Sequence, residues 1–286
     1  MNLNFWLIQT FNGVSYGALL FLLGSGLSLI FGVMRIVNLA HGSYFLLGGY
    51  VALTVIWTTG SWALSIPVAA LSIAVVGLLM ERVFLRPLGF DPLRQVLLTV
   101  GFAFLFQQAA LDIWTGNNFD INPPEALTES VVVAGLYLPL YRVFMITTAL
   151  IIGIGLWLAM EKTRMGAAVR ATVDDAQMAR GVGIDTSRIS MFIFALGAFL
   201  AALGGVIGGA FLGIYPGLDF EILPLAFAVV IIGGMGSLGG AAIGALIVGL
   251  ADNFGKALFP EISYFTLYAP MALILAVKPT GLFGRE

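Results

Sequence analysis

The sequence predicts an all-α, polytopic membrane protein with about eight or nine transmembrane segments, and three observations support this prediction. Hydrophobic residues make up 60% of the 286 residues, where about 45–50% is usual. Charged residues make up only 10%, too few to cover the surface of a water-soluble domain of this size. Apolar runs of about 20 residues, the length a helix needs to cross a ~30 Å hydrocarbon core, recur along the whole chain. We therefore expect residues 1–286 to form a single transmembrane domain.

The first four predicted spans lie on either side of a polar break at residues 34–43. We expect these spans at Ile8–Val33, Tyr44–Trp57, Trp62–Met80 and Val96–Trp114. Five glycines recur in the first span, at positions 13, 17, 24, 26 and 32. Small residues at such spacing let helix backbones approach closely in lipid, so this span is expected to pack tightly against others.

The second half of the chain contains a glycine-rich interruption. We expect spans at Leu140–Met160, Ile189–Leu212 and Tyr264–Val277, with an external turn around Pro216, Asp219 and Glu221. The apolar stretch 222–252 is too long for one comfortable span at about 1.5 Å per residue. Glycines cut it between positions 233 and 240. We therefore predict a glycine-broken hairpin of two short helices near the C-terminus.

The charges of the loops predict an orientation. The connection Arg82–Arg94 and the polar loop 161–188 contain eight of the 13 Lys and Arg residues, whereas Thr115–Tyr137 has acidic residues and no Lys or Arg. Basic loops stay in the cytoplasm. The N-terminus is therefore expected outside and the C-terminal Glu286 in the cytoplasm.

The loop Glu161–Arg188 is the one long polar interruption, and its alanines favour a helix. This helix should end near Gly181 and Gly183, because glycine suits a left-handed C-cap. Its apolar side contains Val169, Val173 and Ala176, and Arg170 and Asp174 are spaced as an i,i+4 pair. Two interpretations stay open, a solvated loop helix and a helix that docks on a partner.

The residues of this loop resemble the cytoplasmic loop of permeases in branched-chain amino acid ABC importers. The similar residues are Arg170-Ala171, Asp175, Met178-Ala179 and Gly183-Ile184-Asp185. Three further motifs are similar to the same family in the same order, at 38–42, 233–237 and 279–284, so the resemblance covers residue 27 to the C-terminus. It implies an ATPase-coupling loop with the site residues Arg170, Ala171, Asp175, Ala179, Gly183 and Asp185.

The resemblance also implies a function. The chain would be the transmembrane permease subunit of an ATP-driven importer for branched-chain or similar neutral amino acids in a bacterial inner membrane. It would work with a second permease of the same family, two cytoplasmic ATPase subunits and an external solute-binding protein that delivers the substrate. ATP and Mg would bind to the ATPase subunits, so this chain is expected to be a transport subunit with no cofactor of its own, not an enzyme.

Two glycine-broken elements occupy similar places in the two halves of the chain, and paired interrupted helices point to a substrate pathway in transporters. The candidate pathway residues are Asn38, His41, Gly42, Gly233, Gly234 and Gly236. A second interpretation is structural: the glycines serve tight helix packing, and His41 and Asn38 satisfy backbone groups that the helix break leaves free.

Several residue patterns are missing, and this excludes some functions. No charged residue falls clearly within a span, so there is no obvious proton or sodium relay. Gly255-Lys256 lacks the glycine spacing of an ATP-binding Walker A motif. The chain has no cysteine and a single histidine, which excludes thiolate and histidine-cluster metal sites. Energy for uphill transport would have to come from another subunit. Alternatives are a permease for another small solute such as urea or an amide, a stand-alone carrier or channel, and, more remotely, an intramembrane enzyme.

Overall fold

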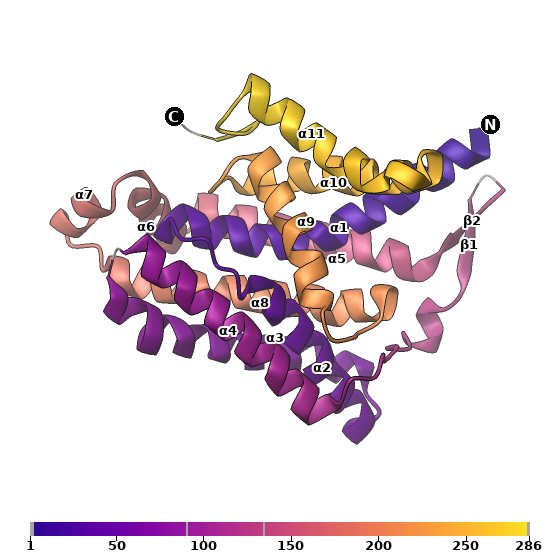
Figure 1. Cartoon of the computed structure of the whole chain (residues 1–286), viewed down its shortest axis with the longest axis horizontal. Coiled ribbons are helices and arrows are strands. Elements are labelled where there is room, and N and C mark those ends of the chain that lie inside the picture. Colours follow the sequence, from indigo (N-terminus) through magenta and orange to yellow (C-terminus); the bar gives the residue numbers. More distant parts are fainter. Residues whose placement is uncertain (1–2, 90, 134, 285–286) are drawn as a thin grey trace.

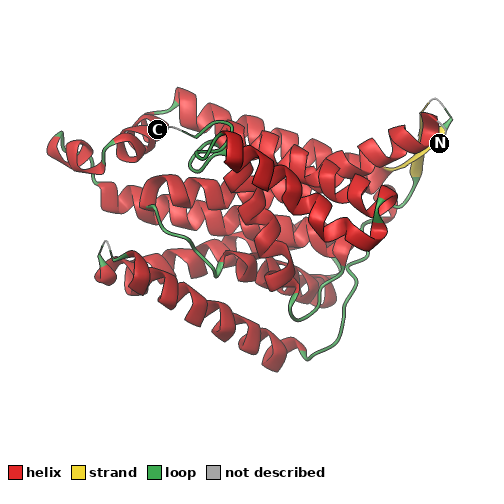
Figure 2. Ribbon diagram, turned by 45° about the horizontal axis from the view of Figure 1, so that its top comes forward, coloured by secondary structure: helices red, strands yellow, loops and turns green. Residues whose placement is uncertain are grey.

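The computed structural model describes residues 3–89, 91–133 and 135–284. Within this part the chain is almost entirely helical (Figure 2), which confirms the predicted fold class. The helices are α1 (Leu3–Met34), α2 (His41–Thr59), α3 (Trp62–Leu79), α4 (Pro92–Trp114), α5 (Leu140–Lys162), α6 (Arg164–Asp174), α7 (Ala176–Gly181), α8 (Thr186–Leu212), α9 (Leu218–Gly233), α10 (Leu238–Leu258) and α11 (Ser263–Val277). A π-helical turn, Met80–Leu85, and a 3₁₀ turn, Arg86–Leu88, extend α3.

One small element is not helical and was not predicted. Strands β1 (Ser130–Val133) and β2 (Leu136–Pro139) pair antiparallel, with Ser130 opposite Pro139 and Val133 opposite Leu136. They lie in the stretch that the sequence assigned to a loop. Valine and tyrosine favour a pleated surface, and the β1–β2 hairpin caps the end of the molecule where α5 begins (Figure 1).

Six of the described helical stretches are long and apolar enough to cross a membrane. They are Leu3–Met34, Trp62–Leu88, Pro92–Trp114, Leu140–Lys162, Thr186–Leu212 and Leu238–Leu258. The predicted eight or nine segments also include α2, α9 and α11, which do not meet this criterion, so that number stays a prediction. Glu286, predicted to be cytoplasmic, lies outside the described residues.

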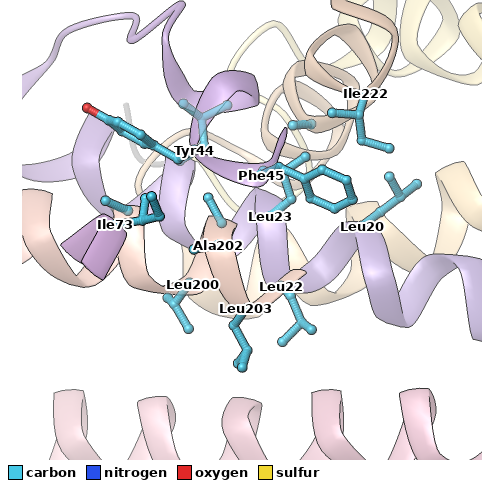
Figure 3. Packing of buried hydrophobic residues seen from close by; sticks show 14 of the residues in the cluster. Leu20, Leu22, Leu23, Tyr44, Phe45, Ile73, Leu200, Ala202, Leu203 and Ile222 are labelled. Carbon is cyan, nitrogen blue, oxygen red and sulfur yellow. The ribbon is translucent and has the colours of Figure 1, made fainter. Parts of the chain in front are cut away.

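Helices α1 and α8 form the centre of the protein, and α2, α3, α9 and α10 pack around them. Glycines allow these close approaches, as the sequence predicted for the first span. A Cβ atom on Gly17 would lie 2.8 Å from the carbonyl oxygen of Ala245, and one on Gly26 would lie 2.7 Å from that of Gly197. Leu20 and Leu23 of α1 are buried and lie beside Phe45 of α2 (Figure 3). Larger residues at these glycines would push the helices apart.

The connections gather at two opposite ends. A cavity of about 310 Å³ is lined by Glu81, Arg86 and Gln95 together with Thr172 and Arg180, so the two loops predicted to be cytoplasmic lie side by side. We call this the basic end. The β1–β2 hairpin and the start of α1 lie at the opposite end, the hairpin end (Figure 1). Loops with the same predicted orientation therefore share one end of the molecule.

Helices α9 and α10 are separated by a glycine turn at residues 234–237. Gly234 and Gly236 have φ angles of 101° and 82°, which only glycine adopts readily. Ser237 then accepts a hydrogen bond from the N–H of Gly240 at 3.0 Å and starts α10. The first helix of this pair, α9, begins at Leu218 and not at the predicted position 222.

Candidate coupling loop and translocation pathway

The candidate coupling loop, residues 161–188, contains two helices where the sequence predicted one. The break falls at Asp175, which has an extended backbone conformation with φ −153° and ψ 100°. Its carboxylate accepts hydrogen bonds from the N–H groups of Gln177 at 2.8 Å and Met178 at 2.9 Å. These bonds, that of Met178 first, hold the pKa of Asp175 below its ordinary value. Asp175 therefore ends α6 and caps α7.

The predicted coupling residues build the conformation of this loop. Arg170 donates a hydrogen bond to the carbonyl of Met160 and lies 3.7 Å from the carboxylate of Glu161. The half-buried Ala171 accepts the N–H of Asp175 at 3.0 Å. These contacts fold α6 back against the end of α5.

The end of the loop, residues 179–188, is also held by a glycine conformation and by hydrogen bonds. Gly183 has a φ of 89°, which confirms the predicted left-handed glycine after the helix. Asp185 caps α8 by accepting the N–H of Arg188 at 3.1 Å. Ala179 is buried, 3% exposed, and its carbonyl accepts the N–H of Ile184 at 3.0 Å. Ala179 therefore faces this protein and not an external partner.

Three apolar residues of the loop, which the sequence did not single out for this role, face outward instead. The side chains of Met165, Met178 and Val182 are 46%, 66% and 70% exposed. The predicted apolar side, in contrast, packs inward: Val169 is buried and Val173 is half-buried. Exposed methionine and valine next to charged residues are suited to a protein contact. The sequence shows that these residues are apolar, but only the structure shows which side they occupy.

A cavity of about 850 Å³ opens beside this loop at the basic end. Its walls come from the end of α1, the end of α5, α6, the glycine turn and the C-terminal segment 279–284. Arg35, Glu161, Arg170 and Asp174 line it together with apolar residues. The cavity thus brings the coupling loop, the glycine turn and the C-terminal motif to one place.

The candidate pathway residues fall into two groups that the structure does not bring together. Gly233, Gly234 and Gly236 lie at the end of α9, against the C-terminal segment. The N–H of Leu282 donates to the carbonyl of Ile232, and the N–H of Phe283 donates to the carbonyl of Gly233, both at 2.9 Å. The second group lies beside the other end of α9, at Leu218. Helix α9 has 16 residues, so its two ends are about 24 Å apart at 1.5 Å per residue.

Asn38, His41 and Gly42 form this second group and are buried at the start of α2. Asn38 Oδ1 accepts the N–H of Ala40 at 3.1 Å, and His41 Nε2 donates to the carbonyl of Leu23 at 3.0 Å. A Cβ atom on Gly42 would lie 2.4 Å from the carbonyl oxygen of Asp219. The polar break therefore folds into the protein, where α2 meets α9.

Ser43 and Asp219 belong to this junction and were missed by the sequence analysis. Ser43 Oγ donates to Asp219 Oδ2 at 3.0 Å, and both residues are buried, 1% and 2% exposed. The sequence placed Asp219 in an external turn together with Pro216 and Glu221. In the structure it lies in the first turn of α9 and is buried. Hydropathy does not reveal this burial.

The sequence was also compared with known proteins. A family model described as the permease component of branched-chain amino acid transport systems matches residues 9–275. The high-affinity branched-chain amino acid transport system permease protein BraD of Pseudomonas aeruginosa is 29% identical over 98% of this chain and 96% of its own length. LivH of Escherichia coli, with the same description, is 32% identical with the same coverage.

An archaeal relative extends this range. The probable branched-chain amino acid transport permease protein LivH of Methanocaldococcus jannaschii is 29% identical over 96% of this chain and 91% of its own length. No solved structure matches. The family model covers most of the chain, and the relatives span it almost from end to end. The chain therefore belongs to the family of membrane-spanning permease components of branched-chain amino acid transport systems.

Proposed function

We propose that this chain is the transmembrane permease subunit of an ATP-driven importer for branched-chain or similar neutral amino acids in a bacterial inner membrane. The observation that carries the proposal is the match over nearly the full chain to permeases that are named for this transport. The coupling loop supports it, because α6 and α7 present exposed apolar residues at one end of the molecule.

The proposed complex contains a second permease of the family, two ATPase subunits that bind ATP and Mg, and an external solute-binding protein. The ATPase would act on α6 and α7. Helix α6 packs against α5, α1 and α8, so a push on the loop would reach the central helices directly. A Cβ atom on Gly166 would lie 2.1 Å from the carbonyl oxygen of Met160, so α5 and α6 are closely packed at this corner. Because close-packed groups move together, a movement of α6 would be transmitted to α5.

The pathway would run past the two interrupted regions, Asn38–Gly42 and the glycine turn at 234–237. Their positions at the two ends of α9 support this proposal, because one short helix then joins the coupling end to the interior. The orientation that we propose places the basic end in the cytoplasm and the hairpin end outside.

We expect single cysteines to report this orientation, since the parent chain has no cysteine. The variants Ala126→Cys and Glu261→Cys should react with a membrane-impermeant maleimide from outside, and Gln177→Cys only after the membrane is opened. All three positions are exposed. Labelling of Gln177→Cys in intact cells would contradict the proposed orientation and place the basic end outside.

The function is tested by isolating the native complex and reconstituting it in vesicles. We expect the ATPase, the second permease and a binding protein to be identified by mass in the purified complex, and leucine uptake to require ATP. Leucine uptake by this chain alone, without an ATPase, would contradict the proposal and favour a stand-alone carrier.

A further inference from the structure

We propose that the junction where α2 and α9 begin recognises the charged groups of the transported amino acid. In this proposal Asp219 binds the α-ammonium group, and the first-turn N–H groups of Gly42 and Ser43 bind the α-carboxylate. The inference rests on the proposed function and names the chemical class of its substrate, a free zwitterionic α-amino acid.

The first argument is the position of the junction. Both helices begin near the middle of the long axis of the molecule, between the basic end and the hairpin end (Figure 1). The backbones touch there: a Cβ atom on Gly42 would lie 2.4 Å from the carbonyl oxygen of Asp219. Interrupted helices that begin in the interior form substrate sites in other transporters, where helix N-termini face the anionic group of the substrate.

The second argument is the absence of caps. Side chains cap α3, α4, α6, α7, α8 and α10, namely Ser61, Asp91, Thr163, Asp175, Asp185 and Ser237. The N-cap residues of α2 and α9 are Ala40 and Gly217, and neither has a side-chain capping bond. Helices α5 and α11 are uncapped as well, but they follow Pro139 and Ile262 in loops outside the junction. The uncapped start of α2 leaves N–H groups that suit a carboxylate.

The third argument is the set of polar atoms that have no partner. Within the part of the chain that the structure describes, Asp219 Oδ1 and His41 Nδ1 are buried and make no hydrogen bond. Asp219 is 2% exposed, and His41 is 0% exposed. Buried polar atoms are nearly always paired, so two unpaired atoms at one junction indicate a place where a ligand completes the bonding.

The charge of Asp219 identifies the group that it binds. None of the ion pairs among the described residues includes Asp219, and a buried carboxylate without a cationic partner is unfavourable. An α-ammonium group supplies the missing cation and its N–H donors. In this structure Ser43 Oγ occupies one donor position, at 3.0 Å from Asp219 Oδ2. The substrate would replace this hydroxyl when α2 and α9 move apart, and the Ser43–Asp219 bond would close the site again afterwards.

The test measures maximal leucine uptake by the reconstituted complex at saturating loaded binding protein. Asp219→Asn keeps the shape and the hydrogen bond from Ser43 but removes the charge. We expect uptake to fall by about tenfold or more, as when a hydrogen bond to a charged group is lost. Ser43→Ala keeps the carboxylate and should lower uptake much less than Asp219→Asn, because the substrate replaces this hydroxyl in the loaded site. The matched control is Asp252→Asn, which alters another buried carboxylate, paired with Lys256 at 2.7 Å.

Two results would overturn the proposal: wild-type uptake by Asp219→Asn, or an equal loss in Ser43→Ala, which would mean that only the bond between the helices matters. A second measurement uses the wild-type complex and needs no variant to fold. During ATP hydrolysis, dicyclohexylcarbodiimide should modify Asp219, as located by peptide mass, and leucine should slow the reaction. Modification that is absent, or equally fast with and without leucine, overturns the proposal.

The identity of the imported substrate is tested separately from the ammonium site. If the wild-type complex imports a different free amino acid, the proposed substrate is wrong and the ammonium site stands. If it imports only solutes without an ammonium group, both proposals fail. Normal branched-chain amino acid uptake by Asp219→Asn defeats only this inference.

Discussion

Replacing Gly234 with leucine should abolish uptake and release the C-terminal segment from the end of α9. Gly234 has a φ of 101°, and a Cβ atom there would lie 2.2 Å from the backbone nitrogen of Gly284. A side chain therefore meets both backbone strain and a backbone neighbour that cannot rotate away. We expect the unfolding free energy to fall by about 2–5 kcal/mol, measured by thermal denaturation of the purified protein, with uptake measured in vesicles.

The matched control for this change is Gly239→Leu, five residues later in the chain. Gly239 lies in the first turn of α10, and a Cβ atom there has no neighbour within 4 Å. This variant should keep the stability of the parent to within about 1 kcal/mol, the helix-propensity range. If Gly234→Leu is as stable and active as Gly239→Leu, the glycine turn is not required for the close contact with the C-terminal segment.

Changing Met178 or Val182 to aspartate should detach the ATPase subunits without unfolding the permease. These side chains are 66% and 70% exposed in the free chain, so a charge there costs the folded permease little. In a complex each would lie in the proposed contact, where a buried charge without a partner is costly. We expect a loss of about 2 kcal/mol or more in association, as for residues central to an interface, which is roughly a 30-fold weaker affinity.

The measurement is co-purification of the ATPase with each variant, followed by ATP hydrolysis with loaded binding protein. Val132→Asp serves as the control, because Val132 is also exposed, at 56%, but lies on β1 at the hairpin end. Ala179→Trp is less informative, since Ala179 is buried within this chain and a large side chain would disturb α7 itself. Full ATPase association with both aspartate variants would show that this outward face is not the coupling surface.

The coupling loop shows how far the sequence could be interpreted. Its alanines, its charges and Gly183 indicated a short helical segment with a left-handed end, and the structure has this. The break at Asp175 was not predicted, because aspartate is acceptable both within a helix and at its start. Only the hydrogen bonds to Gln177 and Met178 decide between the two. The direction of Met178 and Val182 depends on that break, so the exposed face was also missed.

At the junction of α2 and α9, the sequence indicated only some of the residues that the structure brings together. Asn38, His41 and Gly42 were recognised as unusual because polar residues interrupt an apolar stretch. Asp219 and Ser43 were not, since proline, glycine and aspartate close together are typical of a turn between spans. The turn folds α9 back into the interior, and this places a residue from position 219 against one from position 43.

The sequence by itself determined the family, the all-helical class and the division into basic and acidic loops. Composition, apolar run length and motif order are local properties, and the lipid environment demands that each spanning segment satisfies its own backbone hydrogen bonds. The tertiary structure decided which helices are central, where α2 and α9 begin, and which polar groups become buried. Those features arise from contacts between residues that are far apart in the chain, such as Gly42 with Asp219 and Gly234 with Gly284, and no local pattern specifies such pairs.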